Sequence, residues 1–195
     1  MMLAVAQHSF GQNDSENASK SAAEAEATPQ STPEATEGTD GVWNVESPDE
    51  AFFAVARAIP DKVYLYKHYL DGVAVGIFRI EPPEEGKQGP PVVARHDFSG
   101  RLIAHIAWSP DSKFLLFTTV NSNGHSASFA PAFLFCVADK SFRTLDAAIG
   151  NVVSPDFRFE PPDIAVMEVQ RSNDKPEEEV KVPLAKTLPQ MPPVR

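Results

Sequence analysis

The chain has 195 residues, of which 42% are hydrophobic and 23% charged, so it is long enough for one well-cored domain. Its 18 prolines outnumber its 10 glycines, which favours short elements joined by many turns over long helices. The net charge of −10 comes without a cluster of Lys and Arg, and this pattern argues against binding to nucleic acid or to an anionic membrane surface.

Residues 1–41 predict an exported chain with a disordered leader. Residues 1–6 (MMLAVA) end in Ala-x-Ala, which resembles the end of a signal peptide and its cleavage site. We interpret them as the remnant of a clipped secretory signal, so the expected location is secreted or periplasmic; it is cytoplasmic if Met1 is the true start.

The leader itself, residues 7–41, is rich in Ser, Ala, Glu, Thr and Pro, and residues 12–41 hold seven acids and one base. Such a segment buries too little apolar surface to offset the loss of chain entropy on folding. No segment has the roughly 20 consecutive apolar residues that a membrane span needs.

A short N-terminal helix is predicted at residues 48–58. Ser47, Pro48 and Glu50 have the pattern of a capping box with proline at the first helical position, and alanines follow. Pro60 would end the helix. A strand is the alternative, because hydrophobic periodicity is ambiguous in so short a run.

From residue 62 onward the pattern indicates strands. The runs KVYLYKHYL (62–70) and VAVGIFRIE (73–81) flank Asp71-Gly72, a dipeptide that favours a tight hairpin turn. Further runs then predict strands at 92–98, 101–108, 113–120, 132–138, 141–146 and 163–169, the first two joined through Ser99-Gly100.

These runs predict a mainly β domain over residues 42–170, built as an antiparallel meander, with an α+β fold as the alternative. Several runs, notably AFLFCVA (132–138), are apolar at both alternating positions, so both faces of those strands should be covered. Residues 171–195 are proline-rich and are expected to form a flexible C-terminal tail.

The tripeptide Ser-Pro-Asp occurs at 47–49, 109–111 and 154–156, and proline followed by aspartate is typical of tight turns. The run IAWSPDSKFLLFTTV, followed by Val137–Asp139 and Arg143–Leu145, resembles a blade of the TolB-type β-propeller family, which is related to WD40 propellers.

This resemblance covers residues 100–170. It implies propeller-blade-like hairpins, a new blade opening at Ser154-Pro155-Asp156, and a domain that mediates protein contacts. The folded part holds three such units at most, whereas closed propellers need four to eight blades. We therefore expect an open sheet or a sandwich.

The sequence assigns no catalytic residue, metal ligand or cofactor. Residues 124–128 (GHSAS) lack the final glycine of the Gly-x-Ser-x-Gly nucleophile motif, and the histidines show no metal-ligand spacing. Cys136 lies in an apolar run and is interpreted as a small buried hydrophobe. Asp111, Asp139 and Asp156 are interpreted as turn residues. The expectation is a non-enzyme.

One cluster predicts a binding surface. Tyr64, Tyr66 and His68 would share one face of a strand and form an aromatic contact surface; packing against the neighbouring strand is the alternative. The sequence thus predicts a non-enzymatic exported protein that binds a protein partner, takes part in assembly, or forms a homo-oligomer through its sheet edges. A fragment or accessory piece of a propeller-containing peptidase and a small-molecule binding protein are the alternatives.

Overall fold

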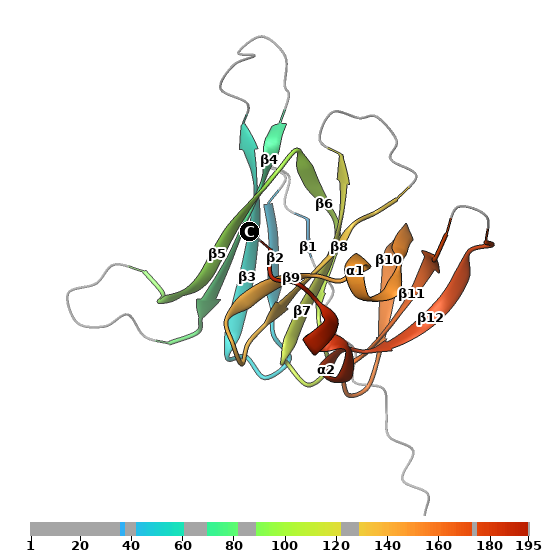
Figure 1. Ribbon diagram of the computed structural model, residues 1–195. Coiled ribbons are helices and arrows are strands. Elements are labelled where there is room, and N and C mark those ends of the chain that lie inside the picture. The colour runs from blue at the N-terminus through green and yellow to red at the C-terminus, as the bar shows by residue number, and fades with distance from the viewer. Residues whose placement is uncertain are drawn as a thin grey trace, which may run out of the picture.

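The computed structural model describes residues 36–37, 42–60, 70–81, 89–121, 129–172 and 175–194. This part of the chain is mainly β, with three open antiparallel sheets and little helix, which confirms the predicted fold class. Within each sheet the strands pair in chain order, so each sheet is a meander (Figure 1).

The first sheet contains β1 (Thr36–Glu37), β2 (Val42–Glu46), β3 (Phe52–Pro60), β4 (Leu70–Arg79) and β5 (Val92–Ser99). The second contains β6 (Arg101–Trp108), β7 (Phe114–Asn121), β8 (Ala132–Cys136) and β9 (Ser141–Thr144). The third contains β10 (Asn151–Glu160), β11 (Ile164–Gln170) and β12 (Glu178–Pro183). The described helical segments are α1 (Asp146–Ile149), α2 (Leu184–Thr187) and the 3-10 turn η1 (Leu188–Gln190).

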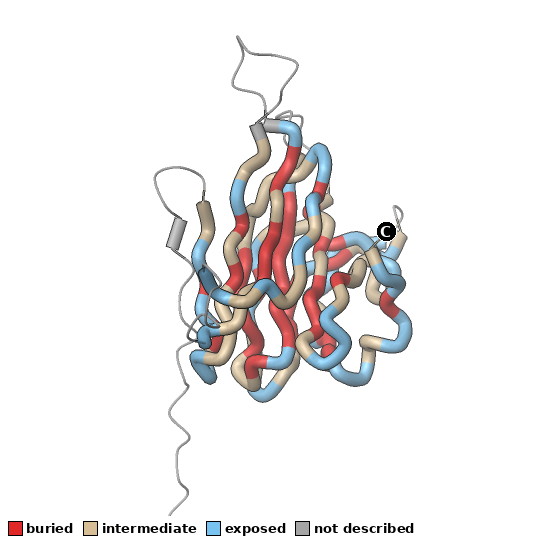
Figure 2. Tube along the Cα trace, turned by 90° about the vertical axis from the view of Figure 1, so that its left-hand side faces the viewer, coloured by how far each residue is buried: buried red, intermediate tan, exposed pale blue. Residues whose placement is uncertain are grey.

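The second sheet is covered on both faces, as its apolar pattern predicts. Along β7, Phe114 and Leu116 pack into the cluster shared with the third sheet, whereas Leu115 and Phe117 pack into the cluster shared with the first. The alternation follows from the period of two along a strand. The three sheets therefore lie face to face, with the second in the middle (Figure 1), and buried residues run along the central strands (Figure 2).

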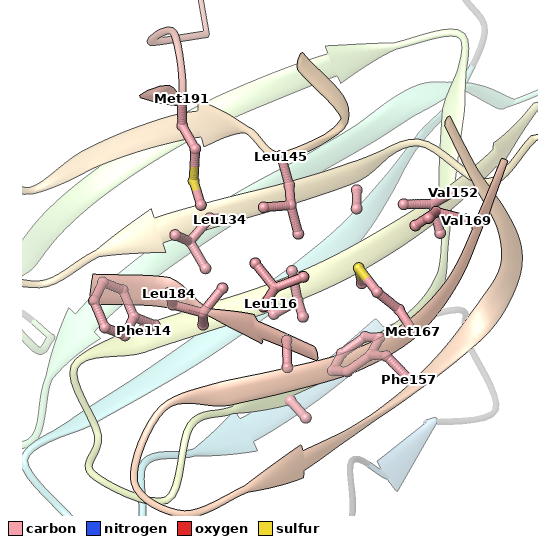
Figure 3. Packing of buried hydrophobic residues seen from close by; sticks show 14 of the residues in the cluster. Phe114, Leu116, Leu134, Leu145, Val152, Phe157, Met167, Val169, Leu184 and Met191 are labelled. Atoms are coloured by element: carbon pink, nitrogen blue, oxygen red, sulfur yellow. The ribbon is translucent and has the colours of Figure 1, made fainter. Parts of the chain in front are cut away.

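The C-terminal segment belongs to this fold as far as residue 194, whereas the sequence predicts a flexible tail at 171–195. β12 pairs with β11 over Glu178–Pro183, and Leu184 and Met191 are almost completely buried. Both side chains lie in the cluster between the second and third sheets (Figure 3). Prolines and charges dominate the composition of this segment, but Val180 and Val182 alternate along β12 and face the core.

The predicted helix at 48–58 is wrong: β3 occupies Phe52–Pro60, and residues 47–51 form the turn between β2 and β3. The Ser47 hydroxyl accepts the backbone N–H of Phe52 (3.0 Å) and donates to Asp49 (2.6 Å). Pairing with strands on both sides supplies β3 with more hydrogen bonds and apolar contacts than a short solvent-facing helix would gain.

The same turn recurs at the second Ser-Pro-Asp. The Ser109 hydroxyl accepts the N–H of Phe114 (3.1 Å) and donates to Asp111 (2.7 Å). In both turns the residue after the aspartate has a left-handed backbone, with φ of 56° at Glu50 and 59° at Ser112. The two turns touch, because the Asp49 N–H donates to the Ser112 hydroxyl (3.0 Å).

The third Ser-Pro-Asp does not open a strand pair. Residues 154–156 lie inside β10, where the pairing with β11 shifts between Val152 and Phe157. The β10–β11 turn instead falls at residues 161–163, directly before β11, and the Pro162 carbonyl accepts the Asp111 N–H (3.2 Å). The successive turns of the three sheets are thus linked by hydrogen bonds at one end of the stack.

Asp71-Gly72 is likewise not a hairpin turn, because both residues lie within β4. Gly72 pairs with Ser99, and a Cβ there would lie 2.2 Å from the Phe98 carbonyl oxygen. The glycine is needed for the close approach of β5 and not for a turn. Gly100, with φ of 68°, carries the chain from the first sheet into the second.

Candidate functional site

The predicted aromatic surface, Tyr64, Tyr66 and His68, lies outside the described residues, as do residues 124–128. The structure therefore bears on the remaining candidates. Across the described ranges, no three His, Cys, Asp or Glu side chains lie close enough together to hold a metal ion. No described helix is long and apolar enough to cross a membrane.

The interpretation of the single cysteine holds. Cys136 is buried, and burial raises the pKa of its thiol. A protonated thiol in an apolar cluster is a poor nucleophile. Asp111 and Asp139 act as turn residues, accepting backbone N–H groups of Lys113 and Ser141, whereas Asp156 lies in β10.

One face of the first sheet has no covering sheet among the described residues, and we call it the outer face. It carries the residues that alternate along β3 and β4 with the buried ones. Three cross-strand pairs lie on it: Phe53 with Phe78, Val55 with Gly76, and Arg57 with Ala74. On the opposite face, Ala54, Ala56, Val73, Val75 and Ile77 are buried against the second sheet.

The outer face is hollowed along β4. A groove of about 350 Å³ is lined by Val55, Arg57, Ala74, Gly76, Phe78 and Arg95. Its floor lies low because β4 places small residues there, while β3 and β5 supply larger side chains as walls. The Phe78 ring closes one end: it stacks on Phe53 with centroids 5.0 Å apart, and a Cβ at Gly76 would lie 2.8 Å from the ring.

Two arginines stand on opposite walls of this groove. Arg57, on β3, is exposed and forms no ion pair with any residue that the structure describes. Arg95, on β5, pairs with Asp97 at 3.4 Å, and both side chains are more than half exposed, so the pair is weak. The groove is therefore apolar at its floor, and both arginines stand at its rim together with Asp97.

Exposed apolar side chains extend the surface beyond Phe78. Val92 is 63% exposed and pairs with Phe78 across β4 and β5, and Ile80, just after β4, is 43% exposed. Large apolar residues exposed together are more informative than single ones, because contiguous apolar patches mark interaction sites.

The open face of the third sheet is different in kind. Its charges pair across the strands: Arg158 with Glu179 at 2.8 Å and Lys181 with Glu160 at 2.7 Å. A face covered by paired charges is well solvated, so this face serves as an internal comparison for the first sheet.

Sequence reasoning missed these groove residues. The dipeptide Asp71-Gly72 has the pattern of a turn, which hides the strand that contains it, and the small residues Ala74 and Gly76 do not by themselves indicate a groove. The available signal was a glycine in the interior of a strand, which marks close approach by a ligand or by another part of the chain.

Comparison with protein-family models, curated protein sequences and solved structures gave no significant match.

Proposed function

We propose that this chain is a non-enzymatic binding or assembly protein, secreted or periplasmic, that holds a protein partner on the outer face of its first sheet. The observation that carries the proposal is the contrast between its two open faces. The first sheet exposes an apolar groove with Arg57 unpaired among the described residues, whereas the third exposes paired charges.

The proposed architecture is propeller-like. Each sheet is a meander, consecutive sheets pack face to face, and the turns at one end are linked in order. Neighbouring blades of a propeller pack in this way, and the open face of a terminal blade is then a natural place for a partner to dock.

Binding is tested by isolating cross-linked complexes of the tagged full-length chain from the cells that produce it. A specific partner should be recovered with the wild type and with Glu168→Ala, which alters the open face of the third sheet, but not with Val55→Glu, which places a charge in the groove. Recovery that is equal for both variants, or no partner at all, would refute this function.

The non-enzymatic part has its own test. Purified full-length protein should leave peptide and ester substrates intact. Turnover that disappears in Ser126→Ala would show that residues 124–128 supply a nucleophile, and the proposal would then be abandoned.

The alternative is that the chain is a piece of a propeller-containing peptidase, and the apolar outer face of the first sheet, which no described segment covers, favours it. Reading the DNA on both sides of the gene discriminates the two. An in-frame extension that encodes further blades or a hydrolase domain supports the peptidase, whereas stop codons together with a complete signal peptide support the binding protein.

A further inference from the structure

We infer that the groove over β4 binds an acidic segment of the partner protein that carries a large apolar side chain. This inference rests on the proposed binding function and adds the chemistry of the partner and the residues that read it. The apolar side chain lies on Ala74 beside the Phe78 ring, and neighbouring carboxylates meet Arg57 and Arg95.

The floor of the groove selects for an apolar group. Ala74 leaves the β4 backbone close to the surface, and Val55 and the Phe78 ring, which lies over Gly76, border it with apolar side chains. A volume of about 350 Å³ is in the range of sites that hold one compact organic group. A side chain seated there removes apolar surface from water on both partners.

The rim selects for negative charge. Arg57 and Arg95 lie on opposite walls of the groove and diagonally across β4: Arg57 pairs with Ala74, Arg95 pairs with Gly76, and Asp97 is the residue that faces Arg57 across Ala74. A guanidinium donates paired hydrogen bonds to a carboxylate in a fixed geometry. The Asp97 carboxylate holds Arg95 only at 3.4 Å in an exposed pair, so an incoming carboxylate competes with it readily.

A groove along a strand fits an extended segment better than it fits a flat surface. The groove runs along β4 and is bordered by β3 and β5. An extended chain places alternate side chains toward the sheet, which matches one apolar group on the floor with acids spaced along the rim.

The test is a selection from a random peptide library on the full-length protein, followed by affinity measurements on individual peptides. The selected peptides should combine a large apolar residue with neighbouring Asp or Glu, and their affinity should fall as salt is raised. Peptides without acids, or no selected peptides, would overturn the inference.

Matched double variants locate the binding. Arg57→Ala with Arg95→Ala and Arg158→Ala with Lys181→Ala remove the same charge from the two open faces. The first pair should weaken the selected peptides about tenfold and the second less than about twofold, because only the first pair contacts the peptide. Equal weakening would show a non-specific charge effect and overturn the inference.

Filling the floor provides an independent readout. Ala74→Leu keeps every charge, and it should abolish binding of the selected peptides while leaving the circular dichroism spectrum and the unfolding midpoint close to those of the wild type. If Ala74→Leu binds the peptides normally, the groove is not the site. The inference and the proposed function can fail separately. If the groove variants lose the peptides but the partner still cross-links in cells, the groove is not where the partner docks and the proposed function fails. If the groove variants lose the partner in cells but bind the peptides normally, the inference about the bound segment fails.

Discussion

Asp146 is a mostly buried carboxylate that connects the second and third sheets. Its two oxygens lie 3.4 and 3.2 Å from the backbone nitrogen of Ala132, and the backbone amide of Val152 also favours its charged form. Burial raises the pKa of Asp146 to about 6, although these hydrogen bonds and the charge of Arg101 oppose the shift. The group is therefore a local source of pH-dependent stability.

The sign of this dependence follows from the direction of the shift. The folded-state pKa lies above the unfolded value of 3.8, so the folded protein binds the proton more tightly. The stabilising contribution is complete below about pH 3.8 and is lost as the pH rises through about 6, by an amount on the order of 2 kcal/mol.

Asp146→Asn removes this titration while keeping an oxygen that can accept the Ala132 N–H. The free energy of unfolding of the variant, minus that of the wild type, should increase between pH 4 and pH 7 and then level off. Urea unfolding measured across this range tests the prediction, and a difference that does not change with pH would contradict it.

Two serines of the Ser-Pro-Asp tripeptides differ in how strongly they hold the backbone around them. Ser109 is completely buried, and its hydroxyl closes the turn between β6 and β7 by accepting the Phe114 N–H. Ser154 has the same neighbours in sequence, proline and aspartate, but its hydroxyl accepts only the Asp156 N–H at 3.3 Å in an exposed position. Sequence alone does not separate these two serines, because the difference lies in their burial.

At the scale of the elements, Ser109→Ala should lower the free energy of unfolding by about 1–3 kcal/mol, because the buried N–H of Phe114 loses its acceptor. The matched change Ser154→Ala should lower it by less than about 0.5 kcal/mol. Chemical denaturation of both variants checks the prediction. Equal effects would mean that the two tripeptides play the same structural role.

Strands with a strong local pattern could be predicted from the sequence. β6, β7, β8, β9 and β11 fall in the expected runs, and the apolar residues on both sides of β7 and β8 correctly indicated two covered faces. These elements could be identified because each run is long and apolar enough for its buried positions to be recognised from the sequence.

Elements whose role depends on distant partners could not be predicted. Residues 48–58 combine a capping pattern with good helix formers, yet β3 forms because β2 and β4 lie on either side of it. The parallel between 47–52 and 109–114, each Ser-Pro-Asp followed three residues later by phenylalanine, was the signal that favoured a strand. The groove was missed for a related reason, since Arg57 becomes a neighbour of Ala74, and Arg95 a neighbour of Gly76, only through strand pairing.

At the scale of the whole molecule, the C-terminal segment completes the core between the second and third sheets. Leu184 is fully buried there (Figure 3), whereas Lys186, two residues later, is exposed. The stack is thus sealed on this side by residues that composition alone assigns to a tail.

Leu184→Ala should lower the free energy of unfolding by about 2–5 kcal/mol, because it leaves a cavity in a packed cluster. Lys186→Ala, in the same short helix, should change it by less than about 0.5 kcal/mol. Thermal and chemical unfolding of the two variants distinguish the cases. A small effect at Leu184 would place the segment outside the cooperative fold.

The proposed function requires that a partner covers the outer face of the first sheet. Site-specific photo-cross-linking in the producing cells tests this most directly, with the reactive group placed at Val55 in the groove or at Glu168 on the open face of the third sheet. We predict a discrete adduct with one partner protein from Val55 and none from Glu168. An adduct from Glu168 alone, or none from Val55, would contradict the assignment of this face.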